Sequence, residues 1–233
     1  MSIKGLIFDF DGLVLETEEP IFQSWQELFQ AYGCQLSYAD WSGTIGTAEA
    51  EFNPATELER QLGCRLDWET VGRQRLQRER ELIALQPPLP GVVQALRDAR
   101  RLGLKVGLAS SSDCEWITGH LRRLGLTDYF DCIMGSDDVR LTKPDPELYT
   151  RALAGLDLQP EQVIVFEDSP NGVWAAKKAG LFSVAVPTEM TRRLPMEHAD
   201  MRLKSLADLP LEKLIEQIEK REFDANFQRT QDY

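Results

Sequence analysis

Short apolar runs that stop at acidic or hydroxyl residues constrain this chain more than any other feature. Four of them are nearly continuous, over residues 3–8, 104–109, 163–166 and 182–186. Such runs are typical of strands covered on both faces, because neither face alternates with polar residues. Segments 132–134 and 201–203 are two further strand candidates.

Helical patterns separate these runs, over residues 92–102, 116–124, 146–154 and 173–179. Glycines at positions 103, 125, 155 and 180 are expected to cap their C-terminal ends in the left-handed conformation. Regular alternation of strand and helix predicts an α/β fold, in which a parallel sheet carries helices on both faces.

One interval interrupts the alternation. Residues 16–86 contain helical patterns without a convincing strand, and a proline-rich stretch over 86–91 ends them. Within this interval we expect helices around the apolar stripe of residues 25–32, over 48–62 and over 68–85. We therefore predict a helical cap (16–86) inserted into a discontinuous α/β core (1–15 and 87–221), followed by a polar tail (222–233). The alternative is that these helices belong to one continuous domain.

Composition narrows the classes of partner. Four cysteines lie 18 to 50 residues apart without a C-x-x-C pair, and with only two histidines a zinc or histidine-rich site is not expected. A net charge of −12 argues against nucleic acid as the partner, and no apolar segment approaches the length of a membrane span. Free cysteines and the absence of a signal-peptide pattern predict a cytoplasmic location. No feature of the sequence identifies a protein partner.

Acidic, hydroxyl and basic residues gather where the predicted strands end or helices begin. The set comprises Asp9, Asp11, Ser110, Ser111, Ser112, Lys143, Glu167 and Asp168. Singly, each is a weak motif: a D-x-D is usually a solvated turn, and a serine run, Ser112 included, is often a helix N-cap. Because the carboxyl ends of parallel strands meet at one edge of the sheet, the set as a whole predicts a shared site there.

The carboxylates of this set predict a metal ion. Its acidic members are Asp9, Asp11, Glu167 and Asp168. Two like charges about 4 Å apart repel by about 4 kcal/mol at an effective dielectric constant of 20, so several of them need a cation. A set of oxygen ligands that keeps waters and accepts a phosphate oxygen suits Mg²⁺, whereas Ca²⁺ is disfavoured because no EF-hand spacing is present.

The same residues suit phosphoryl transfer. Asp9 is the expected nucleophile, forming an aspartyl-phosphate, and Asp11 is the expected general acid and then base. Ser110 and Lys143 are expected to stabilise the charge of the transferring phosphoryl group. The predicted phosphate-binding residues are Gly12, Ser110, Ser111 and Lys143. The expected partner is therefore a small phosphorylated metabolite.

Four motifs resemble those of the haloacid dehalogenase (HAD) superfamily. Residues 9–18 (DFDGLVLETE) look like its first motif, Ser110 its second, residues 143–146 (KPDP) its third and residues 166–172 (FEDSPNG) its fourth. The motifs follow the family's order within residues 3–187.

This resemblance implies a Rossmann-like core and a helical cap like that of the phosphatase and β-phosphoglucomutase branch. It also implies Mg²⁺ held by Asp9, the Asp11 carbonyl and Asp168, with Glu167 assisting. Phosphotransfer members carry an aspartate at the position of Asp11 and dehalogenases do not, so dehalogenation is disfavoured.

Departures from the pattern bear on the reaction. The mutases carry a cap-side histidine where Ile21 stands here, and they hold a second phosphate with a cap arginine. No lysine or arginine occurs between Lys4 and Arg60. Arg60, Arg65, Arg73 or Arg75 could still supply a cap cation. We therefore expect hydrolysis of a small phosphomonoester such as a sugar phosphate. The alternatives are a β-phosphoglucomutase-like mutase and a non-enzymatic phospho-switch resembling a response-regulator receiver, although receivers lack such a cap.

Overall fold

The computed structural model describes residues 2–42 and 52–220. Its centre is a six-stranded sheet of order β3-β2-β1-β4-β5-β6 in which every neighbouring pair is parallel. The strands are β1 (Gly5–Phe8), β2 (Lys105–Ala109), β3 (Cys132–Met134), β4 (Val163–Glu167), β5 (Phe182–Ala185) and β6 (Met201–Arg202). The predicted Rossmann-like parallel sheet is thus confirmed, including its two short edge strands.

The two central strands are buried along their whole length because helices cover both faces of the sheet. In β1, Leu6 and Phe8 join the apolar cluster on one face, and Ile7 joins the cluster on the other. The core helices are α5 (Val92–Leu102), α6 (Cys114–Leu124), α7 (Glu147–Leu156), α8 (Pro170–Lys178) and a helix over 211–220. Short 3-10 turns occur at Thr127–Tyr129, Ser136–Asp138 and Pro160–Gln162. The unalternating apolar runs follow from this two-sided burial.

Glycine ends α5 and α6 as predicted, but not α7. Gly103 and Gly125 take the left-handed conformation, with φ of 70° and 68°. The prediction that Gly155 ends a helix was wrong: α7 continues to Leu156, and Asp157 is the left-handed residue, with φ of 51°. A β-carbon on Gly155 would lie 2.4 Å from the Cys132 sulfur. Glycine at position 155 therefore allows α7 to approach β3 closely.

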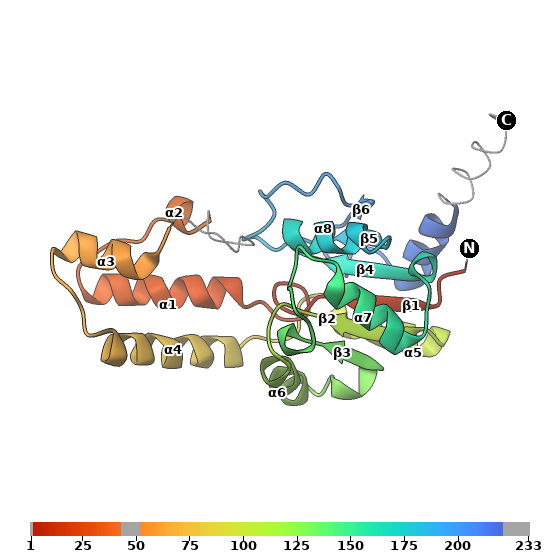
Figure 1. Cartoon of the computed structure of the whole chain (residues 1–233), viewed down its shortest axis with the longest axis horizontal. Coiled ribbons are helices and arrows are strands. Elements are labelled where there is room, and N and C mark those ends of the chain that lie inside the picture. The colour runs from red at the N-terminus through yellow and green to blue at the C-terminus, as the bar shows by residue number, and fades with distance from the viewer. Residues whose placement is uncertain (1, 43–51, 221–233) are drawn as a thin grey trace.

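Four helices follow β1 and lie beside the sheet rather than on its faces (Figure 1). These cap helices are α1 (Glu18–Ala31), α2 (Tyr38–Ser42), α3 (Pro54–Leu62) and α4 (Trp68–Ala84). They share a small apolar cluster, which includes Phe22, Phe29 and Leu58. The first residues of the helix predicted over 48–62 lie outside the described residues. The division into core and cap domains stays a prediction.

The cap helices lie at the end of the sheet where the strands terminate (Figure 1). The loop after β5 contributes Met190 to the cap cluster, and the Tyr38 hydroxyl donates to the Met190 carbonyl over 3.0 Å. On the opposite side, Arg123 of α6 donates to the carbonyls of Ala84 (2.9 Å) and Gln86 (3.1 Å), where the chain leaves α4. The cap helices therefore contact the core at two places near the strand ends. Among helices in the described ranges, none is long and apolar enough to cross a bilayer.

Candidate active site

Lys143 joins the ends of the two central strands. Its ammonium donates to Asp9 Oδ1 and to Glu167 Oε1, over 2.6 Å in each case. Asp9 directly follows β1, where its backbone N–H still pairs with the Phe166 carbonyl of β4, and Glu167 is the last residue of β4. The Lys143 side chain is only 5% exposed, so water screens these two ion pairs little. The structure thus brings together residues that are 24 to 158 positions apart.

Three carboxylates face this one ammonium. Asp9, Glu167 and Asp168 are buried, and one oxygen of each lies within 4.8 Å of the others. Burial and then the charge of Glu167 raise the pKa of Asp9 to about 7, although Lys143 opposes the shift. Burial, followed by the charges of Asp9 and Glu167, also raises the pKa of Asp168 well above its ordinary value. A buried oxygen cluster with excess negative charge fits a hard divalent cation, and these residues therefore fit Mg²⁺.

Tyr149 supports the Lys143–Glu167 pair from α7. Its fully buried hydroxyl donates to Glu167 Oε1, and the Lys143 ammonium lies 5.2 Å from the centre of its ring. Burial by itself lowers the pKa of Lys143, but the charges of Asp9 and Glu167 outweigh it and raise the pKa overall. Lys143 is therefore a permanent cation of the site. Tyr149 was not predicted from the sequence, because it lies on an apolar face of α7 whose pattern predicts only a place in the core.

The segment after β4 closes around the Glu167 carboxylate. The Ser169 hydroxyl donates to Glu167 Oε2 over 3.3 Å and caps α8 by accepting from the Gly172 N–H. A β-carbon on Gly172 would lie about 2 Å from the carboxylate atoms of Glu167. Only glycine at position 172 lets the first turn of α8 pass so close to Glu167.

Gly12 plays a similar part for Asp168. Its φ of 77° lies in the left-handed region, and a β-carbon there would be 2.3 Å from Asp168 Oδ2. Any other residue at position 12 would be strained and would displace that carboxylate. The geometry thus gives Gly12 a steric role towards Asp168; its predicted contact with phosphate stays a prediction.

Asp11 turns away from the three-carboxylate cluster and towards α6. Its Oδ2 accepts from the Ser112 hydroxyl (2.7 Å) and the Ser110 hydroxyl (3.3 Å), and its Oδ1 accepts from the Trp116 indole N–H (3.1 Å). Ser112 therefore binds Asp11 and does not cap α6; Asp113 is the cap, accepting from the Trp116 backbone N–H. The Asp11 side chain is not among the clustered carboxylates, so only its carbonyl stays a predicted metal ligand.

Of the predicted serines, Ser110 is buried beside Asp11, whereas Ser111 is exposed. The Ser112 backbone N–H donates to the Ser110 hydroxyl over 3.0 Å, which fixes the turn after β2. The contribution of Ser112 and Trp116 could not be read from their sequence positions, since both lie in a stretch that equally predicts an ordinary helix start.

A second group of possible metal ligands is internally satisfied. The Cys114 thiol donates to Asp138, and the Cys114 backbone N–H donates to Asp137. Burial, and then the hydrogen bond to Asp138, raise the pKa of the Cys114 thiol to about 12. A thiol that stays protonated is a poor metal ligand, so this group is best explained as the link between α6 and the loop after β3.

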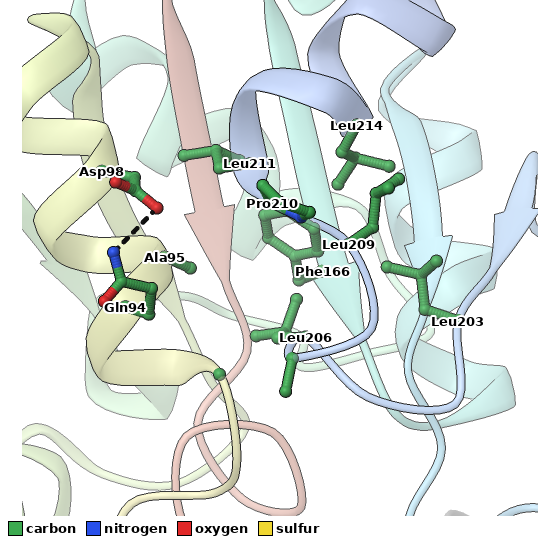
Figure 2. Close-up of a pocket in the computed structure, with 12 residues that line it drawn as sticks. Gln94, Ala95, Asp98, Phe166, Leu203, Leu206, Leu209, Pro210, Leu211 and Leu214 are labelled. Carbon is green, nitrogen blue, oxygen red and sulfur yellow. Dashed lines mark hydrogen bonds between the residues drawn. The ribbon is translucent and has the colours of Figure 1, made fainter.

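A separate cavity of about 400 Å³ lies between α5, β4 and the helix over 211–220 (Figure 2). Its walls are mostly apolar and include Phe166, Leu206 and Leu214. Its polar members Gln94 and Asp98 are hydrogen-bonded to each other over 3.1 Å. None of the predicted site residues lines this cavity.

Comparisons with known proteins agree with this arrangement. The family described as "Haloacid dehalogenase-like hydrolase" matches residues 6–186. Protein YhcW of Bacillus subtilis (strain 168), whose name assigns it provisionally to the phosphatases, is 44% identical over 216 residues, covering 93% of this chain and 98% of that protein. A Thermotoga maritima protein named "Phosphorylated carbohydrates phosphatase" is 34% identical over 179 residues, covering 77% and 82%. A solved T. maritima structure, provisionally a beta-phosphoglucomutase, superposes with a TM-score of 0.76 at 28% identity, covering 94% and 99%.

Proposed function

Because the chain belongs to the haloacid dehalogenase-like hydrolases and is a phosphoric monoester hydrolase, we propose that it hydrolyses a small sugar phosphate or similar metabolite through an aspartyl-phosphate at Asp9. The observation that carries the proposal is the buried Lys143 ammonium between Asp9 and Glu167. A lysine in that position orients the nucleophile and offers positive charge where a phosphoryl group would enter.

The proposed cofactor is Mg²⁺, held by Asp9, Asp168 and the Asp11 carbonyl, with Glu167 assisting. It would supply positive charge that offsets the repulsion between a carboxylate nucleophile and an anionic phosphate. The excess of buried carboxylates over ammonium groups among the described site residues supports a divalent cation there.

In the proposed first step, an Asp9 carboxylate oxygen attacks phosphorus and forms a new P–O bond. The bond from phosphorus to the ester oxygen breaks, and its electron pair goes to the departing alkoxide. Asp11 donates a proton to that alkoxide, so an alcohol leaves and Asp11 becomes a carboxylate. Lys143 and the Ser110 hydroxyl are the groups proposed to bind the phosphoryl oxygens.

In the proposed second step, the Asp11 carboxylate accepts a proton from water as the water oxygen attacks phosphorus. The bond between phosphorus and the Asp9 oxygen breaks, and its electron pair returns to Asp9 as a carboxylate. Inorganic phosphate leaves and Asp11 is protonated again. The net reaction is ester plus water to alcohol plus phosphate.

A mutase would have to hold a second phosphate from the cap, and the cap arginines support hydrolysis instead. Three of the four candidates already pair with a glutamate of their own helix: Arg60 with Glu57, Arg73 with Glu69 and Arg75 with Glu79. A paired arginine offers less charge to a phosphate. The second candidate function is nevertheless a phosphosugar mutase, because the solved T. maritima structure carries that provisional name. Because the chain belongs to a family of hydrolases, we do not propose a non-enzymatic switch.

A panel of phosphorylated hexoses, hexitols and pentuloses, assayed with Mg²⁺ for phosphate release, tests the proposal. We expect Asp9→Asn to abolish release while the exposed Asp128→Asn, on a turn before β3, retains it. Turnover by folded Asp9→Asn would overturn the mechanism. Conversion of β-glucose 1-phosphate to glucose 6-phosphate without phosphate release would favour the mutase.

A further inference from the structure

Asp9 and Asp11 are two residues apart, yet their carboxyl groups are held by different parts of the core. Asp9 is bound by Lys143, which follows β3, whereas Asp11 is bound by the loop after β2 and by α6. On the α6 side the donor is Trp116, which none of the four family motifs contains. Its indole N–H lies 3.1 Å from Asp11 Oδ1.

The Trp116 ring is itself held in place. The Asp113 side chain accepts from the Trp116 backbone N–H over 2.7 Å and thereby fixes the first turn of α6. The ring packs against the apolar cluster on this face of the sheet and meets His120 edge to face, with centroids 4.4 Å apart. A large ring fixed on several sides is a rigid platform for a single hydrogen bond.

We propose that Trp116 is a positioning residue that orients the Asp11 carboxyl for proton transfer to the leaving group, a role that rests on the function proposed above. An indole N–H can only donate, so Oδ1 of Asp11 serves as an acceptor throughout. The hydroxyls of Ser110 and Ser112 can donate or accept, and they face Oδ2. Oδ2 is therefore the oxygen that can carry the transferable proton, beside the Ser110 hydroxyl that is proposed to bind the phosphoryl group.

Protons and electrons balance when Asp11 Oδ2 is the proton donor. As the ester P–O bond breaks, its electron pair goes to the alkoxide oxygen, and the proton on Asp11 Oδ2 moves to that oxygen. Asp11 is left as a carboxylate whose oxygens accept from Trp116 on one side and from the serines on the other. Without the indole donor, the carboxyl can rotate and present either oxygen, which lowers the fraction of complexes aligned for proton transfer.

The test separates proton donation from every other function of the site by varying the leaving group. p-Nitrophenolate leaves as a stable anion and needs no proton, whereas a sugar alkoxide does. We therefore expect Trp116→Phe to lower kcat/KM for the best alkyl phosphate of the panel by about 10- to 100-fold. Its kcat/KM for p-nitrophenyl phosphate should change by less than about threefold, because this parameter reports only the steps up to departure of the leaving group.

Trp174→Phe is the matched control, since Trp174 is 41% exposed on α8 and contacts His198. Trp174→Phe should leave kcat/KM unchanged for both substrates. A second pair, Trp116→Gln and Trp116→Met, has side chains of similar length, of which only Gln keeps an N–H donor. The ratio of kcat/KM for the alkyl phosphate to kcat/KM for p-nitrophenyl phosphate should be higher for Trp116→Gln than for Trp116→Met. This ratio does not depend on how much folded protein each variant yields.

An equal loss for both substrates would show a merely structural role, and no loss for either would show that the hydrogen bond is dispensable; each overturns the assignment of Trp116. Equal hydrolysis of p-nitrophenyl phosphate by the wild type and by Asp9→Asn would instead overturn the proposed function, and this role with it. The two failures are therefore distinguishable.

Discussion

Removing the Lys143 ammonium should destabilise the fold strongly and in a pH-dependent way. Lys143→Met keeps most of the side-chain volume but leaves Asp9 and Glu167 without their shared cation. At 2.6 Å and an effective dielectric constant of 20, each of the two ion pairs contributes about 6 kcal/mol of attraction before desolvation is counted. Desolvation and proton uptake by the remaining carboxyls offset much of this. The expected net loss is about 3–5 kcal/mol, as for other buried pairs that lose one partner.

The sign of the pH dependence follows from the carboxyl groups. The pKa of Asp9 is raised from 3.8 to about 7 even with Lys143 present, and without that cation it should rise further. A group whose pKa is higher in the folded state stabilises the fold while protonated, and that contribution is lost as pH rises through the folded-state pKa. The deficit of Lys143→Met should therefore be larger at about pH 8 than at about pH 5.5.

Urea unfolding in EDTA, followed by circular dichroism at both pH values, measures this deficit. The control is Lys177→Met, which breaks a pair with Asp200 of equal length, 2.6 Å, but with side chains 34% and 27% exposed. The control should lose about 0–1 kcal/mol. A deficit for Lys143→Met no larger than that of the control, or one that shrinks as pH rises, would refute the reasoning.

Three further predictions concern the same cluster. Tyr149→Phe leaves Glu167 one hydrogen bond short and should cost about 1.5–3 kcal/mol in chemical unfolding; an unchanged midpoint would contradict this. Gly12→Ala should weaken Mg²⁺ binding by about 10- to 100-fold in calorimetry, because its β-carbon displaces Asp168, and equal affinity would count against that contact. The metal-free wild type should lose thermal stability as pH rises from about 4 through 7, where Asp9 loses its stabilising proton, and Mg²⁺ should flatten the profile; a rising metal-free profile would contradict the raised pKa of Asp9.

The sheet was predictable because each of its central strands is buried on both faces. The residues at which strands and helices begin were less predictable. The run predicted over 3–8 begins as β1 only at Gly5, and the Ile3 N–H is bonded to the Glu219 side chain, 216 residues away, rather than to a neighbouring strand. Similarly, α6 starts at Cys114 instead of Trp116, because Asp113 and not the serine run caps it. Such boundaries depend on long-range or side-chain bonds that apolar periodicity does not encode.

Some residues of the site could be predicted from the sequence and others could not. Asp9, Lys143, Glu167 and Asp168 could be predicted to meet, because parallel strands bring their carboxyl ends to one edge. Tyr149 and Trp116 could not. Each lies on a helix face whose apolar pattern predicts core, and each has a polar tip whose partner is 18 or 105 residues away. The sequence therefore did not identify the aromatic residues that reach this site with a single polar atom.

The proposed role of Asp9 as nucleophile is tested most directly by trapping the intermediate. Wild-type protein turning over p-nitrophenyl phosphate with Mg²⁺ would be quenched rapidly in acid and reduced with borohydride, which converts an aspartyl-phosphate to homoserine. Peptide mass spectrometry then locates the modified residue. We predict homoserine at position 9, dependent on both Mg²⁺ and substrate and therefore absent from protein kept without substrate. Full phosphate release with an unmodified Asp9, or homoserine at another aspartate, would contradict the proposed mechanism.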